Sequence, residues 1–121
     1  MKTILIVDDE FAIRELLALL LRDQGYGVLM APHGAQALEF LCQEPVDLVV
    51  SDVMMPVMDG RALIDAMAAD DTLSAIPFVF ITAVPRRVER SRAAAVLAKP
   101  FNSTHLLEVI RDVIGGPQDG P

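Results

Sequence analysis

The stretch LVVSDVMMP at residues 48–56 decides how this chain folds. It begins with a continuous apolar run, without the polar alternation of a half-exposed strand, which is typical of a strand buried on both faces of a parallel sheet. Pro56 and the pair Asp59 and Gly60 then predict a turn. Asp52 therefore lies at the carboxyl end of a buried strand, where open α/β sheets place their ligand crevice. This position alone makes Asp52 a candidate site residue.

Length and composition limit the class of protein. The chain has 121 residues, is 53% hydrophobic and has a formal net charge of -7. One domain of this length buries roughly two thirds of the surface of its unfolded form. A single cysteine, Cys42, can form no internal disulfide, and no apolar run is long enough for a signal peptide or a membrane span, so we expect a cytoplasmic protein without a membrane partner. The negative charge argues against direct contact with nucleic acid.

The apolar pattern alternates between strands and helices along the whole chain. Strand patterns occur at 3–7, 26–31, 48–52, 78–82 and 96–98, and helical periodicity occurs at 11–24, 35–43, 61–69, 86–95 and 102–114. Such alternation predicts right-handed βαβ units. We therefore expect an α/β fold, a three-layer sandwich with helices on both faces of a five-stranded parallel sheet.

Polar residues interrupt the apolar pattern at the strand ends. They are Asp8 and Asp9 after the first strand, Asp52 after the third, Thr82 after the fourth and Lys99 after the fifth. Because the carboxyl ends of parallel strands meet at one edge of the sheet, these side chains can converge in one crevice. Each motif alone has an ordinary explanation, as a solvated turn or a strand end. Together they predict a site.

The residue types indicate the chemistry of this site. Three carboxylates in one place repel one another unless a cation lies among them, and an all-oxygen site with few protein ligands suits Mg²⁺. Asp52 is either a metal ligand or a nucleophile that forms an acyl phosphate. Lys99 supplies a positive charge for phosphoryl oxygens, and the hydroxyl of Thr82 can donate a hydrogen bond to the same group.

Four motifs in this order resemble the receiver domain of two-component response regulators: VDDE at 7–10, DVMMP at 52–56 followed by Asp59 and Gly60, ITA at 81–83 and KPF at 99–101. The resemblance covers essentially the whole folded chain. It implies a flavodoxin-like fold with strand order 2-1-3-4-5. It also implies that a histidine kinase, a phosphotransfer protein or a small phosphodonor transfers a phosphoryl group to the chain.

The resemblance also assigns roles to individual residues. It implies that Asp52 is the phosphoacceptor, that Asp9, Asp52 and the backbone carbonyl of Met54 bind Mg²⁺, and that Asp8 helps through water. Thr82 and Lys99 are expected to contact the phosphoryl group, and the bond between Lys99 and Pro100 is expected to be cis. A domain of this kind is no turnover enzyme, because it catalyses only its own phosphorylation and dephosphorylation.

The segment between Thr82 and Lys99 departs from the family pattern. It is several residues shorter than in typical receivers, so the helix predicted at 86–95 should be short or irregular. Val96 stands where the family usually has a tyrosine or phenylalanine that relays phosphorylation to the surface. A receiver-like module that signals without phosphorylation is therefore the alternative. A hydrolase that uses an aspartyl phosphate is a third reading, and it is weakened because Met54 stands where a second acid would be needed.

Two further features concern partners and boundaries. Four arginines gather in the short segment, namely Arg86, Arg87, Arg90 and Arg92. They form either a solvated helix face or a surface that docks an acidic downstream effector or a second copy of the chain. The Gly- and Pro-rich residues 115–121 predict a flexible tail or linker, so we expect the receiver domain to occupy residues 1–114.

Overall fold

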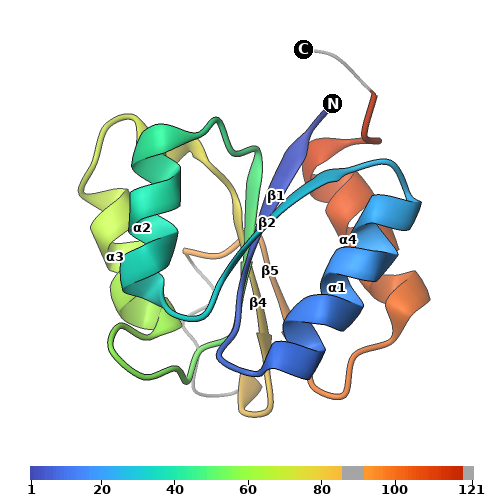
Figure 1. The fold of residues 1–121 in the computed structure, drawn as a ribbon, viewed down its shortest axis with the longest axis horizontal. Helices are drawn as coiled ribbons and strands as arrows, with labels where there is room; N and C mark the ends of the chain where they lie inside the picture. The colour runs from blue at the N-terminus through green and yellow to red at the C-terminus, as the bar shows by residue number, and fades with distance from the viewer. Residues whose placement is uncertain (86–91, 119–121) are drawn as a thin grey trace.

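The computed structural model describes residues 1–85 and 92–118. Its elements follow one another in the order expected for βαβ units (Figure 1). They are β1 (Thr3–Val7), α1 (Phe11–Asp23), β2 (Gly27–Ala31), α2 (Gly34–Gln43), β3 (Leu48–Ser51), α3 (Gly60–Ala68), the short 3-10 helix η1 (Leu73–Ala75), β4 (Phe78–Thr82), β5 (Ala95–Ala98) and α4 (Ser103–Ile114).

All five strands pair in parallel, in the order β2-β1-β3-β4-β5. Helices α1 and α4 cover one face of the sheet, and α2 and α3 cover the other, which gives three layers (Figure 1). The predicted fold class and strand order are confirmed. Because the strands run the same way, the residues that follow β1, β3 and β5 emerge at one edge of the sheet, which we call the carboxyl edge.

The core consists of two apolar clusters, one on each face of the sheet. Successive side chains of a strand point to opposite faces. In β1, Leu5 therefore packs on the side of α2 and α3, and Ile4 and Ile6 pack on the side of α1 and α4. All three are completely buried. This double burial explains why β1 and β3 are continuously apolar, and each such side chain contributes roughly 1.5–3 kcal/mol.

Side-chain caps set the starts of three helices. Asp59 accepts a hydrogen bond from the N–H of Ala62 at the start of α3, and Asn102 accepts one from His105 at the start of α4. At the start of α2, Nδ1 of His33 accepts a hydrogen bond from a backbone N–H. Asn102 is the first residue of the helix predicted at 102–114, whereas the sequence gave no sign of the cap at His33.

The helix predicted at 86–95 falls mostly on residues 86–91, which lie outside the described part of the chain, as do Arg86, Arg87 and Arg90. The described part of this range, residues 92–95, is not helical. The N–H of Ala94 donates to the carbonyl of Phe78, and β5 begins one residue later. These residues do not continue as a helix because their backbone hydrogen bonds are made with β4 and not within a helix. The short helix η1 lies between the ranges predicted as helix 61–69 and strand 78–82, where no element was expected.

Residues 115–118 follow α4 along the opposite edge of the sheet. The hydroxyl of Tyr26 donates to the carbonyl of Gly115 at 2.8 Å, and the N–H of Lys2 donates to the carbonyl of Pro117 at 3.0 Å. The ammonium of Lys2 also donates to the carbonyl of Ile114. The domain boundary at residue 114 stays a prediction. Among the described residues, no helix is long and apolar enough to cross a membrane.

Candidate functional site

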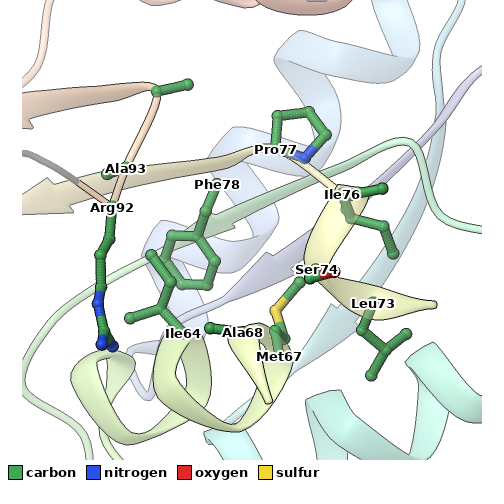
Figure 2. Close-up of a pocket in the computed structure, with 12 residues that line it drawn as sticks. Ile64, Met67, Ala68, Leu73, Ser74, Ile76, Pro77, Phe78, Arg92 and Ala93 are labelled. Atoms are coloured by element: carbon green, nitrogen blue, oxygen red, sulfur yellow. The ribbon is translucent and has the colours of Figure 1, made fainter. Parts of the chain in front are cut away.

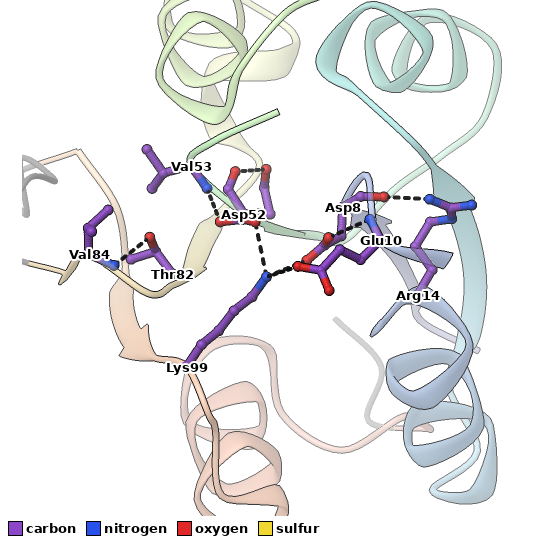
Figure 3. A network of polar contacts seen from close by, with 9 residues as sticks. Asp8, Glu10, Arg14, Asp52, Val53, Thr82, Val84 and Lys99 are labelled. Atoms are coloured by element: carbon purple, nitrogen blue, oxygen red, sulfur yellow. Dashed lines mark hydrogen bonds and ion pairs between the residues drawn. The ribbon is translucent and has the colours of Figure 1, made fainter. Parts of the chain in front are cut away.

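The residues that follow the strands at the carboxyl edge form an acid pocket, which we define by Asp8, Asp9, Asp52 and Lys99. Figure 3 shows Asp8, Asp52 and Lys99. Register places Val7 beside Ser51, so the next residues, Asp8 and Asp52, leave neighbouring strands together. The Lys99 ammonium lies 2.9 Å from Oδ2 of Asp8 and 3.0 Å from Oδ2 of Asp52. The sheet has therefore brought together three polar residues that are far apart in the sequence.

Lys99 is held in the pocket as a cation. Burial by itself lowers the pKa of Lys99, but the hydrogen bonds that its ammonium donates to Asp8 and Asp52, with the two negative charges, outweigh burial and hold the pKa above its ordinary value. Glu10 adds a weaker contact, with Oε1 at 3.9 Å from the ammonium. The sequence analysis did not assign Glu10 to the site, although it adjoins the paired acids Asp8 and Asp9.

The carboxylates themselves are fixed by the backbone. Only 2% of Asp8 and 9% of Asp52 is exposed. Oδ1 of Asp8 accepts a hydrogen bond from the N–H of Glu10, and Oδ1 of Asp52 accepts one from the N–H of Val53 at 2.7 Å. Each of these two acids therefore has one oxygen on the backbone and one on Lys99. Charge-assisted bonds of this kind set the direction of a carboxylate.

The acid pocket fits a hard divalent cation. One carboxylate oxygen from each of Asp8, Asp9 and Asp52 lies within 4.8 Å of the others. Mg²⁺ is bound by oxygen ligands, of which one or two are protein carboxylates and several are waters. Asp9 is exposed, which leaves room for such waters. Met54 follows in the loop after β3 with its side chain exposed, and its role as a carbonyl ligand stays a prediction.

Thr82 ends β4 at the same edge and is completely buried. Its Oγ1 accepts a hydrogen bond from the N–H of Val84 at 3.1 Å (Figure 3). A hydroxyl that accepts one bond still has its own proton to donate. Thr82 therefore remains able to donate to a group that binds at this edge. The peptide bond between Lys99 and Pro100 is cis, as predicted.

Gly60 packs closely against the backbone of Asp52. A Cβ at this position would lie 2.2 Å from the carbonyl oxygen of Asp52 and 2.9 Å from the ring of Phe80. The N–H of Gly60 also donates to the carbonyl of Val53. No side chain fits this close approach, so glycine is required here. Gly60 was predicted as a turn residue and as part of the motif shared with receiver domains, and its close packing against Asp52 is found only in the structure.

The loop between β3 and α3 contains a residue in an unusual conformation. Val57 has a φ of 68°, and the N–H of Met58 donates to the carbonyl of Pro56, which is the hydrogen bond of a γ-turn. For a β-branched residue this φ is a true outlier and costs about 1–3 kcal/mol. The N–H of Gly34, at the start of α2, donates to the carbonyl of Met58 at 2.9 Å. A hydrogen bond of this type contributes about 0.5–1.5 kcal/mol.

Two hollows lie beside the sheet in the described part of the chain, one at the starts of β4 and β5 and one at the carboxyl edge. One, of about 350 Å³, lies between α3, η1 and the start of β4 and is mostly apolar (Figure 2). Arg92 borders it and pairs with Asp65 on α3. The other, of about 410 Å³, is a groove directly beside Lys99, between the first turns of α1 and the residues after β5. The second hollow adjoins the acid pocket, whereas the first has no acidic cluster among its lining residues.

The parallel sheet with an acid pocket and a lysine at its carboxyl edge defines an open α/β domain with a polar site at the strand ends, and the comparison with known families identifies which family it belongs to. The chain belongs to the response regulator receiver domain family, whose model matches residues 4–111. Response regulator Rre1 of Synechocystis sp. is 31% identical over 122 residues, which cover 96% of this chain and 53% of that protein. The chain spans about half the length of the curated relatives it matches.

Solved structures agree with the family. The signal receiver domain of a signal transduction histidine kinase from Syntrophus aciditrophicus superposes with a TM-score of 0.88 at 32% identity, covering 100% of this chain and 96% of that one. The receiver domain of a sensor histidine kinase from Pseudomonas aeruginosa PAO1 has a TM-score of 0.86 at 26% identity, covering 95% of this chain and 98% of that one. In that structure a magnesium ion is coordinated in the active site cleft.

Proposed function

We propose that this chain is a phosphorylation-controlled switch in which Asp52 accepts the phosphoryl group. The observation that carries the proposal is the position of Asp52: a buried carboxylate whose Oδ2 lies 3.0 Å from the Lys99 ammonium, beside Asp8 and Asp9. Family membership supports a phosphoacceptor role. The alternative, a module that signals without phosphorylation, is not favoured, because Val96 and the short segment leave the acid pocket intact.

The reaction follows from the charges in the pocket. A carboxylate oxygen of Asp52 attacks the phosphorus of a phosphohistidine, the O–P bond forms, and the N–P bond breaks with its electron pair on the imidazole nitrogen. The Lys99 ammonium attracts the phosphoryl oxygens, and the Thr82 hydroxyl donates a hydrogen bond to one of them. Asp9, Asp52 and the carbonyl of Met54 are the proposed ligands of Mg²⁺, and Asp8 holds it through water. When bound, Mg²⁺ supplies charge neutralisation for the carboxylates and the phosphoryl group.

The groove beside Lys99 supports a protein phosphodonor. It is lined by Ile13 and Leu16 of α1 and by Phe101, and it ends at Lys99 and Glu10. Leu16 is partly exposed in this lining, with 44% of its surface accessible. An apolar surface next to a phosphoacceptor suits a helix that presents a phosphohistidine. We therefore propose a histidine kinase or phosphotransfer protein as donor, which carries with it a cytoplasmic location.

The proposed output of the switch is contact with a downstream effector or with a second copy of the chain. Receiver domains act on downstream effectors, and the curated relatives include response regulators. Arg92 is the described member of the arginine-rich segment, and it pairs with the exposed Asp65. An exposed pair of this kind contributes little to stability, so Arg92 is free to exchange Asp65 for an acidic group of an effector or of a second copy of the chain.

The test is intact-protein mass spectrometry after incubation with acetyl phosphate and Mg²⁺. Wild type should gain one phosphoryl group, and Asp52→Asn should gain none, because the amide fills the same space without a nucleophilic oxygen. Asp71→Asn, the same change at an exposed acid near η1, is the matched control and should be labelled like wild type. Labelling of Asp52→Asn would place the acceptor elsewhere. No adduct on wild type, with no binding of beryllofluoride, would make the phosphorylation-independent module the better function.

A further inference from the structure

The loop between β3 and α3 connects the phosphoacceptor to the start of α2. We propose that Val57 is a positioning residue that keeps this loop balanced between two conformations, and that a ligand in the acid pocket favours one of them. In the first, which the structure shows, Val57 is strained and Met58 is bonded to Gly34. In the second, Val57 is relaxed and this bond is broken. The ligand-dependent part rests on the proposed function.

The strain at Val57 is not compensated by packing. Its side chain is 81% exposed, so the positive φ brings no burial in return. Where the described chain has a positive φ elsewhere, at Gly25 and Gly115, glycine occupies the position. Relaxation of Val57 towards an extended backbone would remove the strain, and the hydrogen bonds and packing of the neighbouring Met58 oppose it.

Hydrogen bonds to Met58 hold the strained conformation. Its N–H donates to Pro56, and its carbonyl accepts from Gly34. The Met58 side chain also lies against Gly34, where a Cβ would come within 2.7 Å of its Cγ. These bonds are similar in strength to the strain that opposes them, as estimated above. Neither conformation therefore has a large advantage, and a modest bias at one end of the loop can shift the balance.

The other end of the loop lies in the acid pocket. The N–H of Val53 donates to Oδ1 of Asp52, and its carbonyl accepts from Gly60. Met54, the proposed carbonyl ligand, comes next. A cation held by Asp52 and Met54 would fix the first half of the loop in the conformation that the structure shows. This would favour the bond between Met58 and Gly34, so that occupancy of the pocket would be transmitted to the first turn of α2.

Three substitutions at Val57 separate strain from side-chain contact. Val57→Gly and Val57→Asn both tolerate a positive φ, and asparagine does so without the flexibility of glycine. Val57→Ala shortens the side chain but keeps the Cβ and therefore most of the strain, so it is the matched control. Because Val57 is exposed, all three variants should keep the fold, which their melting curves will check.

The experiment is amide hydrogen exchange by NMR at Gly34 and Met58, in the four proteins, with and without Mg²⁺ and beryllofluoride. Without ligand, the Gly and Asn variants should exchange about three- to tenfold more slowly than wild type, and the Ala variant should match wild type. Ligand should slow exchange in wild type and Val57→Ala and add little in the other two. Equal exchange in all four ligand-free proteins, or an Ala variant as slow as the Gly variant, would overturn the proposal.

The ligand-free comparison is independent of phosphoryl chemistry. If Asp52 failed to accept a phosphoryl group while the ligand-free pattern appeared, the proposed function would be wrong and the two-conformation loop would stand. If Asp52 were labelled but ligand left exchange at Gly34 of wild type unchanged, the coupling to α2 would be wrong and the function would stand.

Discussion

The two lysines of this chain lie at opposite edges of the sheet and bind different partners. The edge opposite the carboxyl edge, where the strands begin, is the amino edge. There the Lys2 ammonium donates to the carbonyl of Ile114 at the end of α4. At the carboxyl edge, the Lys99 ammonium donates to two carboxylates, those of Asp8 and Asp52. The first contact balances the partial negative charge of a helix end. The second contact offsets the repulsion between two full negative charges, because one ammonium pairs with both carboxylates.

The difference separates a structural edge from a functional one. At the amino edge, neutral carbonyls accept hydrogen bonds from the Lys2 ammonium and from the backbone N–H of Lys2, so the contacts contribute stability and gather no cluster of like charges. At the carboxyl edge, Asp8, Asp9 and Asp52 form a cluster of three acidic groups, and one lysine pairs with two of them. A protein selected for stability alone has no need of such an excess, because buried acids are costly unless paired. The excess negative charge at the strand ends therefore supports the proposed cation site.

The largest expected effect is that of Lys99→Met. It should lower the rate of phosphorylation by acetyl phosphate about 10²–10³-fold, because a charge that stabilises the transition state is lost. It should also lower the free energy of unfolding in urea at pH 7 by about 2–4 kcal/mol, since Asp8 and Asp52 lose their shared cation in a pocket that opens to water.

Lys2→Met is the matched control at the other edge. It should cost about 1 kcal/mol of stability, the value of one hydrogen bond at a helix end, and leave the phosphorylation rate unchanged. If Lys2→Met slowed phosphorylation as much as Lys99→Met, the separation into a structural and a functional edge would be wrong.

Asp9→Ala should have the next largest effect, on metal binding. Loss of one carboxylate from the cluster should weaken Mg²⁺ binding at least about tenfold in a calorimetric titration. Stability without metal should stay the same or rise slightly, because one member of a repelling cluster has gone. An unchanged Mg²⁺ affinity would show that Asp9 is no ligand.

The smallest effect is a pH dependence. The folded state raises the pKa of Lys99 above its unfolded value, which is about 10.4. Its contribution to stability is therefore complete below about pH 10 and is lost as the pH rises through the folded pKa. As the pH rises above about 10, wild type should therefore lose more stability in urea than Lys99→Met does. Parallel curves for the two proteins would contradict the raised pKa.

The fold and the core of the site are predictable from the sequence because both follow from local pattern and parallel topology. The apolar runs at Thr3–Val7 and Phe78–Thr82 coincide with β1 and β4. Once the strands are parallel, their polar ends must meet, so the contacts of Lys99 with Asp8 and Asp52 follow from the strand assignment. Confirming the roles of these residues requires the experiments above.

Other features escape prediction because they depend on distant contacts. The positive φ of Val57 follows from hydrogen bonds that include Gly34, which lies on a different element. The cap by His33 depends on the direction of one side chain, and histidine is not among the usual capping residues. Similarly, the helix expected before β5 gives way at 92–95, where Ala94 bonds to Phe78. Local propensity contains none of this information.

The hydrogen bond from Lys2 to Pro117 places the two ends of the described fold side by side, at the edge farthest from the acid pocket (Figure 1). A dye, an affinity tag or a solid support attached beside either residue will therefore leave Asp52 open to solution. The same neighbourhood makes the chain a good starting point for circular permutation, since a short glycine linker could join the ends without moving any strand. In such permutants the new chain ends can be placed in a chosen loop. A reporter attached there would turn the domain into a sensor.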